Sequence, residues 1–550
     1  MSTTEALTAP GFLARERTIA GPRFNRWLVP PAALCIHLCI GMAYGFSVFW
    51  LPLSRAIGIT KPVPCPADMS YATSVFSTSC DWVVSSHLGW MYTLFFVLLG
   101  SSAALFGGWL EHAGPRKAGF VAAVCWSGGL VISAIGVYTH QVWMLWLGSG
   151  VIGGIGLGLG YISPVSTLIK WFPDKRGMAT GMAIMGFGGG AMIGSPLADI
   201  LMRHFSTPTS VGVWQTFLAM AAIYFVWMTV GAFSYRVPAP GWQPAGWTPP
   251  AAGSQAMITA KSVHLNVAWK TPQFWLIWWV LCLNVTAGIG IIGVASPMLQ
   301  EVFAGKLIGV AVAFNDLTVT QKEQIATIAA AFTGLLSLFN IGGRFGWASL
   351  SDYIGRKATY FTFFALGLLL YSSAPSSAHA GSIALFVGAI CIILSMYGGG
   401  FATIPAYLAD MFGTQMVGAI HGRLLTAWSA AGIFGPVIVN YMRDYQLSRG
   451  VPKADVYNTT CYIMAGLLAV GFICNAMIRP VDPKYHMTDA ELEAERRLSH
   501  EASAKAIVSA PAADSRPTSP LHALALWAFV GIPLAWGVWV TLQKAVLLFR

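Results

Sequence analysis

One permanent cation lies in an apolar run of the sequence. The stretch FNIGGRFGWASLSDYIGRK covers residues 339–357, and Arg344 precedes the acidic Asp352 by about 12 Å if the run is helical. Helical side chains lean toward the helix N-terminus, so the guanidinium is predicted to point away from the charged end of the run. A guanidinium keeps its proton and pairs with carboxylates through two hydrogen bonds. The position therefore predicts a site for an anionic carboxylate, with backbone carbonyls or a helix end as the alternative partner.

Few other titratable side chains lie in apolar stretches. His37 is a candidate proton carrier, although a lone histidine on such a helix is more often a packing residue. Asp199 is a second candidate, and Arg203, four residues later, is placed to pair with it. Cys65 and Cys80 share one predicted loop and are expected to form a disulfide only if that loop faces an oxidising compartment. No cluster predicts a metal site, a cofactor or a catalytic nucleophile, so an enzyme is not predicted.

The composition indicates that membrane helices position these residues. Hydrophobic residues make up 56% of the chain and charged residues 10%, with a mean hydropathy of +0.64. Soluble proteins carry about 25% charged residues, so lipid must be the main solvent here. The formal net charge of +11 does not indicate nucleic-acid binding, because the basic residues fall in short loops and form no folded basic face.

Apolar segments long enough to cross a bilayer occur thirteen times. All are expected to be helices, because lipid cannot satisfy open backbone groups. Twelve form one series, and the thirteenth follows a polar gap; they lie at 28–53, 87–110, 118–138, 143–168, 178–202, 213–235, 273–298, 325–350, 359–375, 382–411, 416–441, 457–477 and 521–548.

The loops orient the predicted helices. With the N-terminus inside, the inner segments before the tail carry roughly twice as many Lys and Arg residues as the outer loops, which predicts a cytoplasmic N-terminus. The expected divisions are a cytoplasmic N-terminus at 1–26, a six-helix half at 27–236, a Pro- and Gly-rich cytoplasmic loop at 237–272, a second half at 273–480, a charged helix and linker at 481–520, and the thirteenth span at 521–550.

The two predicted halves repeat one another. Glu111, Gly114, Arg116 and Lys117 recur as Asp352, Gly355, Arg356 and Lys357, and Pro164 and Pro196 recur as Pro405 and Pro436, all at a spacing of roughly 240 residues. Such a duplication is the plan of transporters that hold substrate at midplane between their halves. Arg344 has no counterpart, because the matching position is Ala103. Scaffold residues repeat and this cation does not, which favours a substrate role for it.

These repeated loops resemble the signature of the major facilitator superfamily. The run LADMFGTQMVGAIHGRLLTAWSAAGIFGP at 408–436, together with 339–357, is similar to its oxalate:formate antiporter branch, whose relatives include monocarboxylate transporters. Glu111 stands where Asp is usual, and His112 where a base is usual. The resemblance implies a twelve-helix fold of two six-helix halves, here with one extra C-terminal helix. The last helix resembles the one-span companion polypeptides of some such transporters.

The resemblance also implies roles for individual residues. An arginine matching Arg344 is the substrate anchor of the family, and Asn340, one turn earlier, stands where animal monocarboxylate carriers have an aspartate. Oxalate transporters carry a lysine near Trp428, and its absence favours a monoanion. Positions that line the cavity match Tyr44, Phe46, Tyr397 and Phe401. The repeated loop residues are expected to lock one conformation through ion pairs, with simple topology control as the alternative.

The sequence thus predicts a secondary transporter in a bacterial-type inner membrane. Its substrate is expected to be a small monocarboxylate such as lactate, pyruvate or formate, moved with a proton or against a counter-anion. Oxalate:formate exchange is the alternative within the same class. A membrane sensor of small carboxylates is the alternative from another class, although the segment before the last span is short for a signalling domain. The sequence does not define an oligomeric state.

Overall fold

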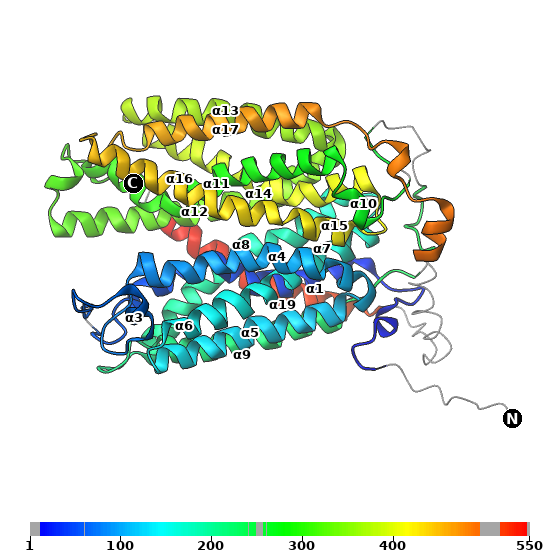
Figure 1. The fold of residues 1–550 in the computed structure, drawn as a ribbon, viewed down its shortest axis with the longest axis horizontal. Helices are drawn as coiled ribbons and strands as arrows, with labels where there is room; N and C mark the ends of the chain where they lie inside the picture. Colours follow the sequence, from blue (N-terminus) through cyan, green and yellow to red (C-terminus); the bar gives the residue numbers. More distant parts are fainter. Residues whose placement is uncertain are drawn as a thin grey trace.

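Long helices make up most of the chain (Figure 1). The computed structural model describes residues 11–59, 61–239, 241–248, 257–259, 261–495 and 518–546. Within these ranges, 13 helical segments are long and apolar enough to cross a membrane, and no strand forms beyond three isolated bridges. The predicted all-α membrane fold is confirmed.

The first six spans form one group. Helix α1 (Val29–Ile40) continues through a 3-10 helix (Gly41–Phe49) into α2 (Trp50–Leu53). A π-helix (Trp146–Gly153) joins α6 (Val142–Leu145) to α7 (Gly154–Trp171). The remaining helices are α3 (Tyr71–Phe76), which lies in a loop, α4 (Gly89–Ala113), α5 (Pro115–Tyr138), α8 (Arg176–Phe205) and α9 (Val213–Ser234).

The next six spans form the second group. They follow a short helix, α10 (Leu265–Ala268), and comprise α11 (Pro272–Phe303), α12 (Val319–Ile354), α13 (Arg356–His379), α14 (Ile383–Phe412), α15 (Val417–Leu424) with α16 (Thr426–Ser448), and α17 (Asn458–Met477). The two groups lie side by side in Figure 1, the first in blue to green and the second in green to orange. They are the two halves of the fold.

Local sequence signals set the ends of the helices that matter most. Thr318 and Gln321 form a capping box at the start of α12, and Thr271 accepts from the Phe274 N–H at the start of α11. Gly114 and Gly355 end α4 and α12 with φ of 82° and 86°. A side chain is strained at such angles, so glycine at these two points lets each half turn sharply into its next helix.

The two ends of the bundle differ in what they carry. The lock face is the end that holds residues 111–117 and 352–357, together with the N-terminal segment and residues 480–495. The disulfide face is the opposite end, which holds Cys65, Cys80 and α3 (Figure 1). Every spanning helix runs between these two faces.

The last helix, α19 (Pro520–Ala545), lies along the boundary between the halves. It contacts α1 and α8 of the first half and α12 of the second. The Phe529 ring stacks on Trp227 at 4.0 Å, and the Trp527 indole donates to the Trp27 carbonyl. A Cβ at Gly189 of α8 would lie 3.1 Å from Leu534, so this leucine packs directly against the boundary.

Parts of four predicted segments lie outside the described residues. These are residues 1–10, several positions of the central loop, residues 496–517 of the tail and residues 547–550 of the thirteenth span. Residues 489–495, at the start of the predicted charged helix, are helical, and Thr488 and Glu491 bond as a capping box predicts.

Candidate functional site

Arg344 is fully buried at the contact between the two halves. Its Nε donates to Asn340 Oδ1 at 2.8 Å, and its Nη1 lies 3.3 Å from the carbonyl oxygen of Ile184 on α8. Its Nη2 is buried without a hydrogen-bond partner. Among the residues that the structure describes, no carboxylate forms an ion pair with this guanidinium.

Glycines on the facing helices make room for this arginine. A Cβ at Gly188 of α8 would lie 3.0 Å from Arg344 Nε, and a Cβ at Gly398 of α14 would lie 2.3 Å from the Asn340 carbonyl. Helix α12 therefore packs closely against α8 in one half and α14 in the other. The sequence brings the cation to the interface by removing side chains opposite it.

Aromatic rings cover the guanidinium on two sides. The Phe187 and Phe401 ring centres lie 5.7 Å and 5.3 Å from Arg344 Cζ, within cation–π range. Trp428 packs on Phe401 at 4.3 Å and on Phe187 at 5.3 Å. These rings come from both halves and leave the arginine shielded from solvent in this conformation.

Several hydrogen-bond donors next to these rings lack acceptors. Tyr161 lies 5.3 Å from Trp428, and its hydroxyl, the Trp428 indole N–H and Arg344 Nη2 are all buried without partners. Buried donors are normally paired, because leaving one unpaired is costly. A group of donors with a positive charge and no acceptor is suited to a small anion with apolar parts.

One hydrogen bond joins the halves beside this group. The Tyr44 and Tyr397 hydroxyls lie 3.0 Å apart, on the first span and on α14. Both tyrosines are within electrostatic range of Arg344. We call Arg344, Asn340, Tyr44, Tyr161, Phe187, Tyr397, Phe401 and Trp428 the central site.

Most of the predicted substrate residues meet here, but Phe46 does not. Its ring packs on Phe49, Phe95 and Phe217 inside the first half. Tyr44 and Phe46 are two positions apart on a helical segment, so their side chains leave it in different directions. The Phe46 position belongs to the core of the first half.

Sequence reasoning missed Tyr161 and Phe187. Tyr161 precedes the Pro164 repeat landmark, and Phe187 precedes the glycine run of α8. Neither lies beside a charged residue in the sequence, so only the packing of α7 and α8 against the second half identifies them.

The two predicted proton carriers have different surroundings. His37 is fully buried, with Nδ1 2.5 Å from the Ala183 carbonyl oxygen and Nε2 3.1 Å from the Tyr161 carbonyl oxygen. Asp199 pairs with Arg203 at 2.9 Å near the end of α8, where the Arg203 side chain is largely exposed and the Asp199 side chain is half-buried. His37 alone of the two borders the central site.

A network of charges joins the halves at the lock face. Asp352 accepts from the backbone N–H groups of Gly177 and Met178 at 2.8 Å and 2.9 Å, at the N-terminus of α8. Asp410 accepts from Arg176 at 2.8 Å and from Arg356 at 3.1 Å. The contacts of Asp352 with α8 and of Asp410 with Arg176 cross between the halves, whereas the contact of Asp410 with Arg356 lies within the second half. Arg356 also pairs with Asp352 at 2.6 Å within the second half.

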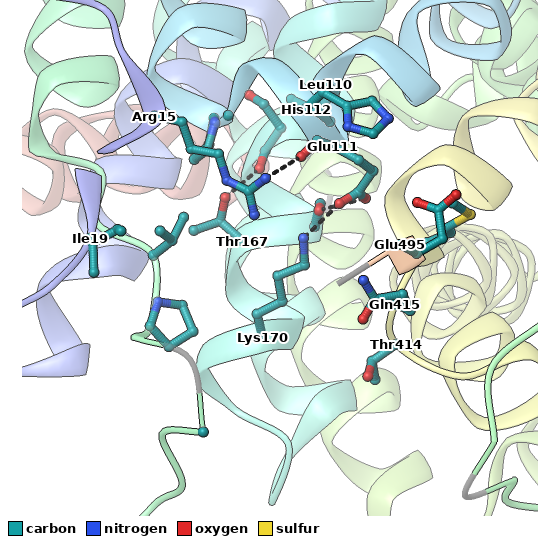
Figure 2. A pocket seen from close by; sticks show the side chains of 18 residues that line it. Arg15, Ile19, Leu110, Glu111, His112, Thr167, Lys170, Thr414, Gln415 and Glu495 are labelled. Atoms are coloured by element: carbon teal, nitrogen blue, oxygen red, sulfur yellow. Dashed lines mark hydrogen bonds and ion pairs between the residues drawn. The ribbon is translucent and has the colours of Figure 1, made fainter. Parts of the chain in front are cut away.

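The corresponding loop of the first half lies beside a cavity of about 430 Å³ (Figure 2). Glu111 pairs with Lys170 at 2.7 Å, and Arg15 donates to the Glu111 backbone carbonyl. A Cβ at Gly418 would lie 2.6 Å from Glu111 Oε1, so Glu111 meets the first turn of α15 as Asp352 meets that of α8. The repeated acidic residues Glu111 and Asp352 therefore each lie against the first turn of a helix in the other half.

The other basic residues of these loops contact neighbours within their own halves. Arg116 donates to the Arg17 carbonyl, and its guanidinium lies over the Phe233 ring. Lys117 lies near the Trp109 ring at 5.9 Å, and Lys357 donates to the Ala476 and Ile478 carbonyls.

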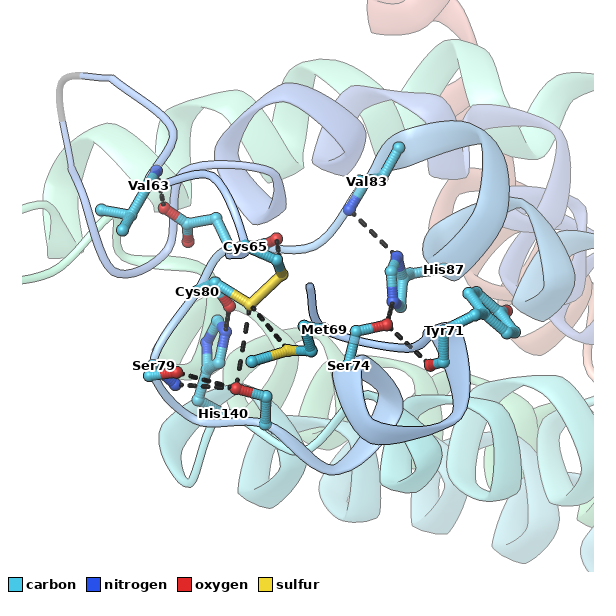
Figure 3. Close-up of a disulfide and its surroundings, with 12 residues drawn as sticks. Val63, Cys65, Met69, Tyr71, Ser74, Ser79, Cys80, Val83, His87 and His140 are labelled. Atoms are coloured by element: carbon cyan, nitrogen blue, oxygen red, sulfur yellow. Dashed lines mark hydrogen bonds between the residues drawn. A yellow bond between two sulfur atoms is a disulfide. The ribbon is translucent and has the colours of Figure 1, made fainter. Parts of the chain in front are cut away.

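A disulfide closes the loop on the opposite face (Figure 3). Cys65 and Cys80 are bonded, with 4.8 Å between their Cα atoms. The Cys80 carbonyl lies 2.8 Å from Nε2 of His140, whose ring stacks on Trp82 at 4.3 Å. Burial lowers the pKa of His140, so this ring is neutral near pH 7.

Comparisons with known proteins place this architecture. The family model described as Major Facilitator Superfamily matches residues 33–436 and, in a second match, 307–548. The oxalate:formate antiporter of Oxalobacter formigenes is 27% identical over 413 residues, covering 75% of this chain and 83% of that protein. Apicoplast pyruvate carrier 1 of Toxoplasma gondii is 24% identical over 515 residues, covering 82% and 88%.

Solved structures share the fold at low sequence identity. The fucose:proton symporter of E. coli superposes with a TM-score of 0.56 at 12% identity, over 83% of this chain and all of that one. A proton:xylose symporter superposes with a TM-score of 0.55 at 15% identity, over 85% and 98%.

Proposed function

The chain belongs to the Major Facilitator Superfamily of membrane transporters, and we propose that it carries a small organic monocarboxylate. The observation that carries this proposal is the Arg344 guanidinium, buried with Nη2 unpaired. A cation in the middle of a membrane protein is costly, and a substrate carboxylate would offset that cost with charge-assisted hydrogen bonds. Tyr161 and Trp428 supply further donors, and Phe187 and Phe401 contact the apolar part.

The charge of the central site favours a monoanion. Arg344 is the one cationic side chain among the residues that form it. The resemblance to oxalate transporters implies a lysine near the position of Trp428, and this chain has none there. A dianion would therefore keep one carboxylate without a counter-charge. Lactate, pyruvate and formate are the substrates of choice on this ground.

Oxalate:formate exchange is the second candidate. It is favoured by the similarity to the Oxalobacter antiporter, whereas the similarity to the apicoplast pyruvate carrier favours a monocarboxylate. Formate would use the central site in both cases. The two candidates differ in whether uptake needs a counter-anion inside the vesicle.

Transport proceeds by opening the halves at one face and then at the other. The lock face is closed by the Asp352 and Asp410 contacts, so substrate enters this conformation from the disulfide face once the Tyr44–Tyr397 bond breaks. We place the protein in a bacterial-type inner membrane with the lock face on the cytoplasmic side. The loops of that face are rich in Lys and Arg, and the disulfide lies on the opposite face. The loop residues then act as the conformational lock.

Uptake into proteoliposomes tests the proposal. Radiolabelled lactate, pyruvate, formate and oxalate are offered to the purified chain, with and without an internal counter-anion and a pH gradient. Uptake of a monocarboxylate is the expected result. Uptake of oxalate alone, and only into vesicles that contain formate, would favour the oxalate:formate exchanger. No uptake of any of the four would overturn transport of this class.

A variant links transport to the central site. Arg344→Lys keeps the charge but loses the forked geometry, so at least a tenfold loss of uptake is expected with normal insertion. Arg203→Lys is the matched control, because Arg203 is exposed and far along α8, and its uptake should equal that of the natural chain. Normal uptake by Arg344→Lys would remove this arginine from the site.

A further inference from the structure

A second boundary between the halves lies between α4 and α15. A Cβ at Gly422 of α15 would lie 2.2 Å from the Ala103 carbonyl oxygen of α4, so the two backbones are in close contact. Helix α19 covers the boundary between α8 and α12, and among the described residues it makes no comparable contact with α4 or α15. Leu105 and Phe106 of α4 are exposed beside this second boundary, so its outer side faces lipid.

A cavity of about 460 Å³ lies at the lock-face end of this boundary. Ala104 of α4 forms its wall in the first half. Its other walls come from the second half, namely α10, the start of α11 and the turn from α15 to α16. Helices α10 and α15 lie toward the lock face in Figure 1. We call this space the boundary cavity, and it touches both halves.

The boundary cavity is positively charged. Among the described residues that line it, Lys270 and Arg423 are cationic and none is acidic. Arg423 donates to the Leu265 carbonyl at 2.9 Å and to Asn266 Oδ1 at 3.1 Å, so neutral groups fix its position and leave its charge unbalanced. Lys270 is exposed and precedes the N-terminus of α11, whose dipole adds a partial positive charge. An anion is therefore favoured here.

The cavity of Figure 2 provides a contrast at the same face. Its lining includes two acidic residues, Glu111 and Glu495, and Glu111 pairs with Lys170 at 2.7 Å. The bases of that cavity therefore already face carboxylates of this chain. The boundary cavity differs, because its two cations meet no carboxylate along its described walls.

Exposed tryptophans mark the depth of the boundary cavity in the membrane. Trp269 and Trp275 line it, and Trp279 follows one turn later on α11; all three are exposed. Tryptophan prefers the level at which lipid head groups meet acyl chains. Arg423 Cζ lies 6.0 Å from the Trp269 ring centre, and its side chain leans toward the lock face, where α15 begins. The two cations therefore lie at the level of lipid phosphates.

We propose that the boundary cavity binds an anionic phospholipid from the leaflet at the lock face. Lys270 and Arg423 pair with the phosphate, Trp275 packs on the glycerol region, and one acyl chain lies along α4 beside Leu105. Basic pockets between membrane helices at this level bind lipid head groups. The lipid contacts both halves of the transporter. This site is separate from the central site, so the inference does not depend on which anion is carried.

A soluble phosphate would meet the same two cations. The surroundings of the cavity favour the lipid, because Trp275 and Leu105 present apolar surface that a soluble anion leaves uncovered. The two sources therefore share the phosphate chemistry and differ in whether acyl chains contribute to binding. The experiment needs one arm for each source.

Native mass spectrometry counts the lipids bound to the purified, delipidated full chain in detergent. Phosphatidylglycerol is compared with phosphatidylcholine of the same acyl chains, which carries no net charge. Each cation near the membrane surface adds about fivefold in affinity for an anionic lipid, so the first phosphatidylglycerol should bind with a roughly 20-fold lower Kd. Inorganic phosphate and glycerol 3-phosphate are added as competitors, and neither should displace the lipid at equal concentration.

Variants locate the bound lipid. Lys270→Gln and Arg423→Gln should each lower the preference for phosphatidylglycerol about fivefold, and the double variant should lose it. Lys175→Gln is the matched control, because Lys175 is also exposed at the lock face but lies outside the boundary cavity. A photoactivatable phosphatidylglycerol should attach to peptides that contain Ala104 or Trp275.

Three results would overturn this inference. The first is equal binding of the two lipids by the natural chain, which needs no variant to fold. The second is an unchanged preference in Lys270→Gln, whose exposed side chain can be replaced without disturbing the packing. The third is displacement of the lipid by phosphate or glycerol 3-phosphate, which would assign the cavity to a soluble anion. None of them affects the proposed function, because the uptake assay tests the central site separately.

Discussion

Replacing Asp352 by Asn should open the lock face. The Asp352 carboxylate accepts two backbone N–H groups of the other half at 2.8 Å and 2.9 Å, and it does so at a helix N-terminus that favours negative charge. Asn has nearly the same shape and keeps one acceptor oxygen, so the change removes charge with little change in packing. Arg356 keeps its second partner, Asp410.

The size of the effect follows from these contacts. A hydrogen bond to a charged group contributes about 1.5–3 kcal/mol and a neutral one about 0.5–1.5 kcal/mol, so the contact that the Asn oxygen keeps weakens by about 1 kcal/mol. The other N–H then faces the Asn NH2 group and loses its acceptor, which costs at least about 1 kcal/mol more. A total of at least about 2 kcal/mol corresponds to at least roughly a 30-fold shift in the ratio of open to closed lock face. If the open form is about 1% populated in the natural chain, the variant brings it to at least about a quarter.

Pulsed electron spin resonance measures that population as a distance distribution. Spin labels at Lys175→Cys and Lys484→Cys lie on exposed parts of the two halves at the lock face, after the half-buried Cys125 and Cys474 have been replaced by Ser. Asp352→Asn should add a longer distance that the parent lacks.

The matched control is Asp444→Asn, because Asp444 is exposed and makes only a 3.5 Å contact with Arg443. Its distance distribution should equal that of the parent. If Asp352→Asn also equals the parent, the bonds from Asp352 to α8 do not hold the lock face closed.

Three further predictions concern the central site and the loop at the disulfide face. Tyr397→Phe removes the 3.0 Å hydrogen bond to Tyr44, which contributes about 1 kcal/mol, so radiolabelled substrate should dissociate roughly fivefold faster from the variant. Trp428→Lys adds a second cation beside Arg344, so competition assays should show at least a tenfold shift of preference from lactate toward oxalate; an unchanged preference would mean that Trp428 does not face the substrate. Replacing Cys65 and Cys80 by Ser opens a loop of 15 residues, which costs up to about 3 kcal/mol, so the Tm should fall by a few degrees. A reductant should lower the Tm of the natural chain equally and leave the double variant unchanged.

The sequence predicts the arrangement of membrane helices because each one is a long apolar segment. Lipid requires long apolar helices, and the spans predicted from hydropathy agree with the helices to within a few residues at most ends. The larger differences lie at the end of α11, the start of α12 and the end of α16, which all extend beyond the predicted spans. Arg344 could be singled out because a buried cation is rare. The repeated glycines could be aligned because each one turns a helix at the same place in its half.

The partners of these residues could not be predicted for a physical reason. Membrane helices are apolar on every face, so no amphipathic pattern shows which side of α7 or α8 meets the second half. Tyr161 and Phe187 were missed on that account, and Phe46 was assigned to the site although it faces the core of its own half. Arg176 and Asp410 lie far apart in sequence and carry no signal that they meet.

The position of α19 has a consequence for how the halves can move. Its first turns are attached to the first half through Trp27 and Trp227, while Thr541 lies against Gly334 of α12 in the second. Rocking one half against the other therefore makes this helix slide on at least one of its neighbours. Gly189 and Gly334, which lie beneath it, have no side chains, so they offer little steric resistance to this sliding. Helix α19 also covers part of the boundary between the halves, so lipid chains do not reach the parts of α8 and α12 that lie beneath it.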